Sequence, residues 1–215
     1  MPATIQQIKQ ALGLVDFDAE SAQKKMAPLS RAFVRPVGLD GAPRLGGVLV
    51  LLFCKDESLH IVLTRRRDDL ASHAGQISFP GGRNEKSETL LDTALRETEE
   101  EVGIAAMDLE MLGALTPIYI PPSDYEVYPY VAWFSKGELP VFRAAPQEVA
   151  EIIEAPLATL LDPASRNEET WDFNGQQIVV PFFVVQGSKV WGATAVMLSE
   201  FVERLRVILT WDASL

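Results

Sequence analysis

The sequence predicts an α/β fold in which strands and helices alternate along the chain. Three observations support this prediction. The apolar run at residues 46–53 is rich in Val and Leu and is typical of a strand buried on both faces. Residues 60–66 follow a short polar turn and complete a hairpin. Residues 87–102 place their apolar side chains on one helical face and are followed by Gly103, a residue suited to the end of a helix.

The other elements predicted along the chain are consistent with this class. No change of composition separates two domains. We expect residues 44–215 to form the main domain and residues 1–43 to be an N-terminal extension packed on it. The predicted elements are an amphipathic helix at 4–14, strands at 109–115 and 127–134, a turn and helix at 148–161, a hairpin of strands 171–173 and 177–185 around Asn174-Gly175, and a closing helix at 194–209.

Composition and charge restrict the class of function. The 19 basic and 30 acidic residues give a formal net charge of −11, which argues against a nucleic-acid-binding protein because phosphate neutralisation needs a basic face. No segment predicts a secretion signal or a membrane span, so we expect a cytoplasmic protein. Cys54, the one cysteine, lies within an apolar run, and we expect it in the core.

Three glutamates stand at helical spacing in the sequence RETEEEVG at residues 96–103. Glu97, Glu100 and Glu101 would share one face of the helix. Like charges at this spacing repel by roughly 0.2–0.5 kcal/mol per pair, and the helix C-terminus adds further negative potential. A hard divalent cation such as Mg²⁺ or Mn²⁺ would explain the cluster. The alternative is a solvated acidic face.

The spacing around these glutamates is more specific than the cluster itself. Gly82 is followed after five residues by Glu88, and seven residues later by the segment 96–104. This pattern resembles the Nudix box, Gx5Ex7REUxEExGU with U apolar, and departs from it only where Thr98 occupies a U position. The resemblance implies the Nudix fold, a mixed β-sheet sandwiched between α-helices, with the box forming a loop–helix–loop.

The resemblance implies a role for each residue of the box. Glu97, Glu100 and Glu101 would bind Mg²⁺ or Mn²⁺. Arg96 would orient these glutamates through a bidentate contact, unless it is an ordinary surface arginine. Glu88 is a candidate partner for Arg96.

Two further features of the site follow from the same resemblance. Gly81 and Gly82 would let a loop bring its backbone near the substrate phosphates, or they form a plain turn. Glu100 and Glu101 are the first candidates for the base that takes a proton from the attacking water. Glu148 in a downstream acidic segment is the alternative base, or else a solvated acid.

The segment before the box resembles one branch of the family, the coenzyme A diphosphatases. The sequence LTRRR at 63–67 and HAGQISFPGG at 73–82 is similar to the extra motif of that branch, and the segment 190–195 is similar to its C-terminal part. The implied reaction is hydrolysis of coenzyme A or its derivatives to 3′,5′-ADP and 4′-phosphopantetheine. Arg67 and Ala71 depart from the motif.

Within this motif, side-chain alternation puts Arg65 and Arg67 on one face of a regular strand and Arg66 on the other. We expect Arg66 to contact a substrate phosphate. Arg65 and Arg67 are expected to be solvated or paired with the neighbouring Asp68 and Asp69. His73 and Gln76 would contact the substrate or hold the loop, and the sequence does not decide between these roles.

Rival functions remain open at this point. Another Nudix hydrolase would act on ADP-ribose, dinucleotides or other nucleotide derivatives. A protein of a different class would be a non-catalytic nucleotide sensor, although the intact carboxylates argue against it. The partner expected is a small nucleotide-like diphosphate, with no nucleic acid and no membrane. A homodimer is a family-level expectation.

Overall fold

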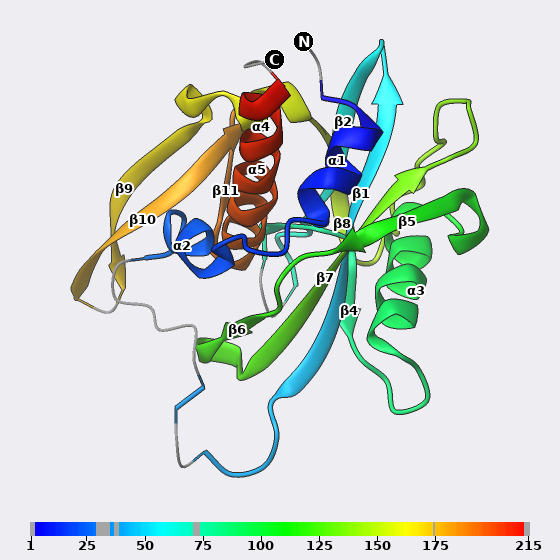
Figure 1. The fold of residues 1–215 in the computed structure, drawn as a ribbon. Helices are drawn as coiled ribbons and strands as arrows, with labels where there is room; N and C mark the ends of the chain where they lie inside the picture. Colours follow the sequence, from blue (N-terminus) through cyan, green and yellow to red (C-terminus); the bar gives the residue numbers. More distant parts are fainter. Residues whose placement is uncertain (1–2, 29–34, 37–38, 71–73, 174, 213–215) are drawn as a thin grey trace.

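The computed structural model describes residues 3–28, 35–36, 39–70, 74–173 and 175–212 (Figure 1). The helices are α1 (Ile5–Leu12), α2 (Ala19–Lys24), α3 (Leu90–Val102), α4 (Leu157–Leu161) and α5 (Gly192–Asp212), with 3₁₀ turns η1 (Ala106–Asp108), η2 (Pro121–Ser123) and η3 (Pro163–Ser165). The strands are β1 (Arg44–Lys55), β2 (Ser58–Arg66), β3 (Ile77–Ser78), β4 (Gly81–Arg83), β5 (Leu109–Ala114), β6 (Ile118–Ile120), β7 (Tyr125–Phe134), β8 (Val149–Pro156), β9 (Arg166–Phe173), β10 (Gln176–Val185) and β11 (Ser188–Trp191).

The main sheet is mixed, as the sequence predicts. Within the described residues it has eight strands. Five follow the order β3-β2-β1-β7-β5, and the other three pair beside them, β4 with β1, β6 with β7 and β8 with β2. β1 and β7 run parallel along residues 44–52, whereas β1 and β2 form the predicted antiparallel hairpin. Helix α3 lies on one face of this sheet, and α1 and α5 lie on the other (Figure 1).

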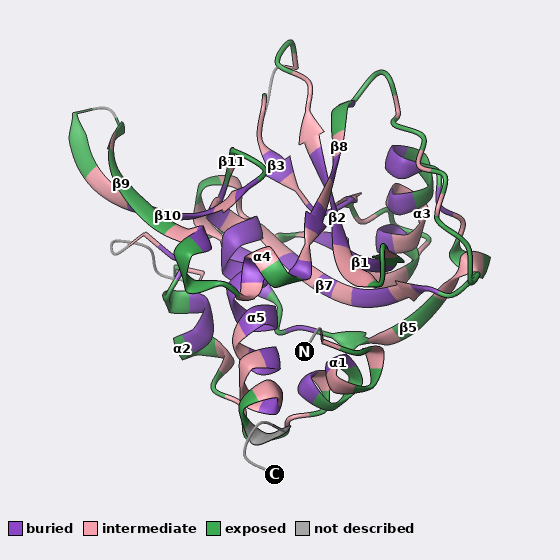
Figure 2. Ribbon diagram, turned by 90° about the horizontal axis from the view of Figure 1, so that it is seen from above, coloured by how far each residue is buried: buried purple, intermediate pink, exposed green. Residues whose placement is uncertain are grey.

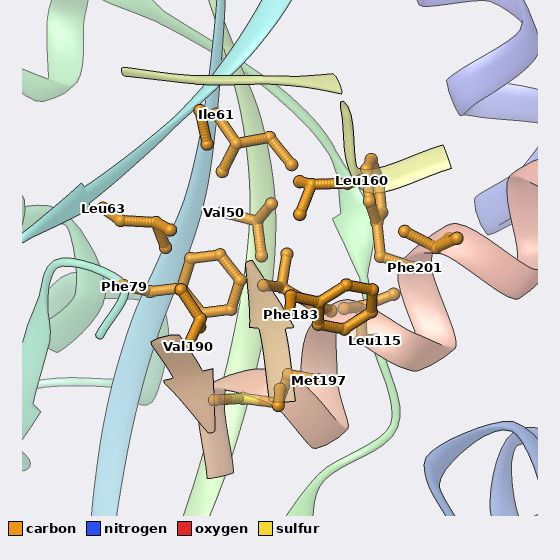
Figure 3. Packing of buried hydrophobic residues seen from close by; sticks show 14 of the residues in the cluster. Val50, Ile61, Leu63, Phe79, Leu115, Leu160, Phe183, Val190, Met197 and Phe201 are labelled. Carbon is orange, nitrogen blue, oxygen red and sulfur yellow. The ribbon is translucent and has the colours of Figure 1, made fainter. Parts of the chain in front are cut away.

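Strand β1 is buried on both faces, which confirms the prediction from its apolar run. Val50 and Leu52 contribute to the core beneath α5, where Phe183 and Phe201 also pack (Figure 3). The alternate residue Leu51 belongs to a second cluster on the α3 side. Helices therefore cover both faces of the sheet, and a separate set of apolar side chains is buried on each face.

Helix α3 begins two residues later than the sequence predicts for its cap. The N-cap is Thr89 rather than Ser87, because Thr89 and Asp92 exchange hydrogen bonds in a capping box. Ser87 has Leu90 three residues on, which offers no such acceptor. Gly103 adopts φ 76° at the C-terminal end, so the predicted helix stop is confirmed.

Residues 148–161 differ most from the prediction of a turn and a helix. Most of this segment is strand β8, and the helix α4 is confined to Leu157–Leu161. β8 pairs with β2 along seven positions, from His60 to Arg66. Long-range pairing and the β-branched pair Ile152-Ile153 outweigh the helix propensity of the neighbouring Ala and Glu.

Cys54 is exposed, so the prediction of a core cysteine is wrong. It lies near the tip of the β1–β2 hairpin, opposite Leu59 and one residue before Lys55, which ends the strand. The tip extends past the helices that cover the sheet (Figure 1). Position along the strand, rather than the apolar composition of the run, decides its exposure.

The second sheet has the order β11-β10-β9. The β9–β10 hairpin projects from the body of the protein, and much of β9 is exposed (Figure 2). These strands pair up to Phe173 opposite Gln176, which confirms the predicted hairpin; Asn174 itself lies outside the described residues. Helices α1 and α2 both pack against α5. Among the described helices, none combines the length and the apolar character needed to cross a membrane.

Candidate active site

The predicted acidic helix face lies at the C-terminal end of α3, and its three glutamates differ in exposure. The Glu97 side chain retains 17% exposure and that of Glu100 retains 59%. Glu101 is buried, with 5% exposure. The helix therefore presents a graded row of carboxylates, from solvent at Glu100 to the protein interior at Glu101.

Arg96 connects the acidic side chains of the helix to its N-terminal flank. Its Nε and Nη2 donate to the two oxygens of Glu88 at 3.0 and 2.9 Å. Its Nη1 donates to Glu97 at 2.9 Å and to Glu100 at 3.2 Å. Hydrogen bonding to Arg96 lowers the pKa of Glu88 to about 2. The bidentate contact of Arg96 is therefore made with Glu88, which confirms the expected contact between them, whereas Glu97 and Glu100 share the single nitrogen Nη1.

Glu101 is the most unusual ionisable group of this site. The hydroxyl of Thr64 on β2 donates to its Oε2 at 3.2 Å. Within the described part of the chain Glu101 makes no ion pair. Burial, followed by the charges of Glu97 and Glu148, raises the pKa of Glu101 to about 8, against the opposite effects of the Thr64 hydrogen bond and the charge of Arg66. Burial also raises the pKa of Glu97.

Thr64 is a site residue that our sequence reasoning missed as a contact to the glutamates. Alternation along β2 would have indicated it, because Val62, Thr64 and Arg66 share one face of a strand. Val62 packs in the cluster on the α3 side of the sheet. Thr64, two residues after Val62 on the same face, therefore lies at the C-terminal end of α3.

Gly81 and Gly82 form strand β4, not the open loop that the sequence predicts. They pair with Val48 and Gly47 of β1. A Cβ atom on Gly82 would collide with the carboxyl group of Glu97. The absence of a side chain at Gly82 therefore leaves room for one of the predicted metal ligands, which is a reason for glycine beyond backbone freedom.

The opposite wall of the site is the segment that leads into β8. A cavity of about 320 Å³ is lined by the three helix glutamates together with Ala145, Gln147 and Glu148. The alternative base Glu148 therefore lies at the same cavity as Glu97, Glu100 and Glu101. Sequence reasoning did not identify Gln147, since an isolated exposed glutamine carries no signal.

Arg66 reaches this wall at a bulge. The register between β2 and β8 shifts between Arg65 and Arg66, and bulges of this kind redirect side chains near active sites. Arg66 Nη1 lies 3.5 Å from Glu148 Oε2. Its Nε is buried without a hydrogen-bond partner among the described residues. Arg66 thus offers a cationic donor beside the acidic cavity.

The two flanking arginines make the ion pairs that the sequence predicts. Arg65 lies 3.2 Å from Asp68, and Arg67 lies 2.6 Å from Asp69. The main-chain carbonyl of Gln76 accepts the Arg66 N–H at 2.9 Å, which places residue 76 beside the end of β2. His73 and Ala71, named in the sequence analysis, lie outside the described residues.

The carboxylates have the donor chemistry of a site for a hard divalent cation. Oxygen ligands suit Mg²⁺ and Mn²⁺. Burial and the neighbouring acids disfavour the charged form of Glu101 in the protein alone, and a cation bound there would favour it. Among the described residues, no three acidic, histidine or cysteine side chains already converge closely enough to hold a metal ion. Glu97 and Glu100 would have to turn from Arg96 toward Glu101.

Comparisons with known proteins agree with this geometry. A model of the NUDIX domain matches residues 43–174, more than half of the chain. The uncharacterized Nudix hydrolase NudL of Photorhabdus laumondii is 36% identical over 173 residues, which cover 80% of this chain and 90% of that protein. NudL of Yersinia pestis is 33% identical over 165 residues, covering 76% and 81% of the two chains.

Solved structures with the same fold are more distant in sequence. RenU, a Nudix hydrolase from M. smegmatis, aligns with a TM-score of 0.52 at 14% identity, covering 80% of this chain and 88% of that chain. A MutT/nudix family protein from Enterococcus faecalis aligns with a TM-score of 0.51 at 18% identity, covering 98% and 76%. These likenesses concern the fold alone.

Proposed function

Because the chain belongs to the Nudix hydrolase family, we propose that it hydrolyses the diphosphate bond of a nucleoside diphosphate that is linked to another moiety. The proposed substrate is coenzyme A or one of its derivatives, with 3′,5′-ADP and 4′-phosphopantetheine as products. The family accounts for the type of bond. The choice of coenzyme A is supported by the resemblance of the segment at residues 63–82.

The single observation that carries the proposal is the environment of Glu101. A buried carboxylate whose pKa is raised to about 8 lies at a cavity shared with Glu97 and Glu148. Burial of a carboxylate beside other acids is unfavourable for the fold. Groups whose pKa is shifted in this way are concentrated at functional sites. An ordinary solvated acidic helix face would not bury its last glutamate.

The residues at the cavity have different proposed roles in the reaction. A divalent cation held by Glu97, Glu100 and Glu101 would, when bound, screen the phosphate charges and acidify a water molecule. Arg96 orients two of these carboxylates through its Nη1. Glu100 or Glu101, or alternatively Glu148, accepts the proton of the attacking water on a carboxylate oxygen.

Arg66 is the proposed contact to a substrate phosphate. Its guanidinium group lies beside Glu148, and its buried Nε has no hydrogen-bond partner among the described residues. A phosphate oxygen is a suitable acceptor for this planar donor. Arg67 is engaged by Asp69 instead. The phosphate contact therefore falls to the middle arginine of the three.

A second candidate is hydrolysis of ADP-ribose, a dinucleotide or another nucleotide derivative at the same carboxylates. Arg67 and Ala71 favour it, because both depart from the coenzyme A motif in the region expected to recognise the substrate. A non-catalytic nucleotide sensor is a third. It would bind such a compound without cleaving it.

The test is incubation of the purified protein with Mg²⁺ or Mn²⁺ and a panel of coenzyme A, acyl-coenzyme A, ADP-ribose, NADH and diadenosine polyphosphates. Liquid chromatography and mass spectrometry identify the products. We expect 3′,5′-ADP and 4′-phosphopantetheine, lost when a chelator is added. Cleavage of ADP-ribose or dinucleotides instead would keep the glutamate helix but reject coenzyme A, and binding without turnover would favour the sensor.

A further inference from the structure

The segment that carries Glu148 is attached at its beginning to the catalytic helix. The main-chain N–H of Arg143 donates to the carbonyl of Val102 at 2.9 Å, and that of Ala145 donates to the carbonyl of Glu101 at 3.0 Å. These bonds use carbonyls at the C-terminal end of α3, which have no partners within the helix. The wall of the cavity is therefore fastened directly to the residues that precede Gly103.

The end of the same segment is attached through Arg67. Its main-chain N–H donates to the carbonyl of Glu148 at 3.0 Å, and its Nη1 donates to the carbonyl of Pro146 at 2.6 Å. Asp69 holds the guanidinium group in place by accepting from Nε at 2.8 Å and from Nη2 at 2.6 Å. One arginine thus spans Asp69 on one side and Pro146 on the other.

Arg65 provides an internal comparison for Arg67. It also lies at the end of β2 and forms ion pairs, with Asp68 at 3.2 Å and Glu151 at 3.3 Å. Its partner Glu151 lies in β8, beyond the segment at residues 143–148. Both arginines are paired with acids, and their side chains retain 30% and 42% exposure. The hydrogen bond to the Pro146 carbonyl is made by Arg67.

We propose that Arg67, held by Asp69, is a positioning residue that fixes the segment at residues 145–148 and so sets the place of Glu148 in the cavity. This inference rests on the proposed function for its catalytic consequence. Arg67 acts through the loop and does not touch the substrate. Its side chain binds the carbonyl of Pro146, in addition to the main-chain hydrogen bonds that hold residues 143, 145 and 148.

Hydrogen exchange tests the attachment without any substrate. The amides of Glu148 and Val149 both donate to the carbonyl of Ala145, so they exchange through opening of this segment. In Arg67→Ala we expect them to exchange about three- to tenfold faster, the effect of losing one charge-assisted contact at the surface. Arg65→Ala should leave them unchanged. Equal exchange in wild type and Arg67→Ala would overturn the inference.

Kinetics test the consequence, with coenzyme A or whichever compound of the panel the wild type cleaves. We expect Arg67→Ala to lower kcat about three- to tenfold with a smaller change in KM, and Arg67→Lys to recover part of the loss. In the Glu148→Gln background, Arg67→Ala should have no further effect. Additive losses would show that Arg67 does not act through Glu148.

The two tests separate the possible failures. Absence of turnover by the wild type, with faster exchange in Arg67→Ala, would reject the proposed hydrolysis and keep the attachment. Wild-type turnover by Glu148→Gln would overturn the catalytic part of the inference while the helix glutamates stay in their proposed role. A melting curve for Arg67→Ala and Arg65→Ala shows whether both variants are folded.

Discussion

Two buried glutamates, Glu101 on α3 and Glu200 on α5, have very different surroundings. Glu200 accepts hydrogen bonds from the main-chain N–H and the hydroxyl of Thr116 at 3.1 and 2.9 Å. Gln23 donates to it at 2.8 Å and Arg204 at 2.9 Å. Its charge is therefore well satisfied, and its partners join α2, α5 and the β5–β6 connection into one unit.

Glu101 has the same chemistry and comparable burial, with far less support. Among the described residues, the hydroxyl of Thr64 is the one donor to its carboxylate, and the acidic groups Glu97 and Glu148 lie near enough to raise its pKa. The difference teaches that burial of a carboxylate has two meanings. Where donors surround it, the carboxylate stabilises the fold; where acids lie beside it, we propose that the carboxylate binds a ligand.

The largest expected effect is on catalysis at Glu101. We expect Glu101→Gln to lower kcat by about 10²- to 10⁴-fold, because Glu101 is a proposed metal ligand and one of the candidates for the base. The free energy of unfolding should not fall, because a neutral amide is easier to bury than a carboxylate. Steady-state kinetics on the cleaved compound measure this. Glu99→Gln, an exposed residue of the same helix, is the control and should retain the wild-type rate.

Glu200 should give the opposite result. Glu200→Ala leaves the buried Arg204 without the carboxylate that neutralises it, which costs about 3–5 kcal/mol of unfolding free energy. Urea denaturation measures the loss, and kcat of the folded fraction should stay at the wild-type value. If Glu200→Ala does not fold, Glu200→Gln gives a smaller loss of the same sign. Unchanged stability in both variants would contradict the structural role.

A smaller effect is expected at Gly82, which touches the site from β4. The added Cβ of Gly82→Ala must displace the Glu97 carboxyl group, and we expect activity to fall about 10- to 100-fold, as for other changes that disturb metal-ligand orientation. The flexible Glu97 side chain can move, so stability should change less than in Glu200→Ala. Activity and denaturation are measured on the same preparation. Wild-type activity in Gly82→Ala would show that the position of Glu97 is not critical.

The smallest expected effect is a pH dependence of stability in chelator-treated protein. The pKa of Glu101 is about 8 in the folded protein, against 4.5 for an unperturbed glutamate, so the folded state binds this proton more tightly. The resulting stability is present below pH 4.5 and is lost as the pH rises through 8. Urea midpoints at acidic and mildly alkaline pH measure the slope. Glu101→Gln should lose this part of it, and Glu200→Gln should keep it.

The sequence predicts the site well where it depends on spacing along one helix. The shared face of Glu97, Glu100 and Glu101 follows from the 3.6-residue period. The contact between Glu88 and Arg96 follows from the spacing around the helix, which makes Glu88 a candidate partner for Arg96. The ion pairs of Arg65 and Arg67 were also expected, since Asp68 and Asp69 are close in sequence.

The remaining features depend on pairings between distant segments. Glu148 meets the helix because β8 pairs with β2, and we predicted a helix there instead. The bulge that turns Arg66 toward Glu148 arises from that same pairing. The network of Glu200 joins residues far apart in the chain, with no local pattern that identifies it. Such contacts come from tertiary structure, which a single sequence does not display.

Titration of Mn²⁺ into the purified protein, followed by electron paramagnetic resonance of the free ion, tests the central claim most directly. The account predicts that the wild type binds Mn²⁺, that Glu101→Gln weakens binding by at least about tenfold, and that Glu200→Gln binds as the wild type does. Equal Mn²⁺ affinity in wild type and Glu101→Gln would contradict the assignment of the buried helix glutamate to a metal-dependent hydrolytic site.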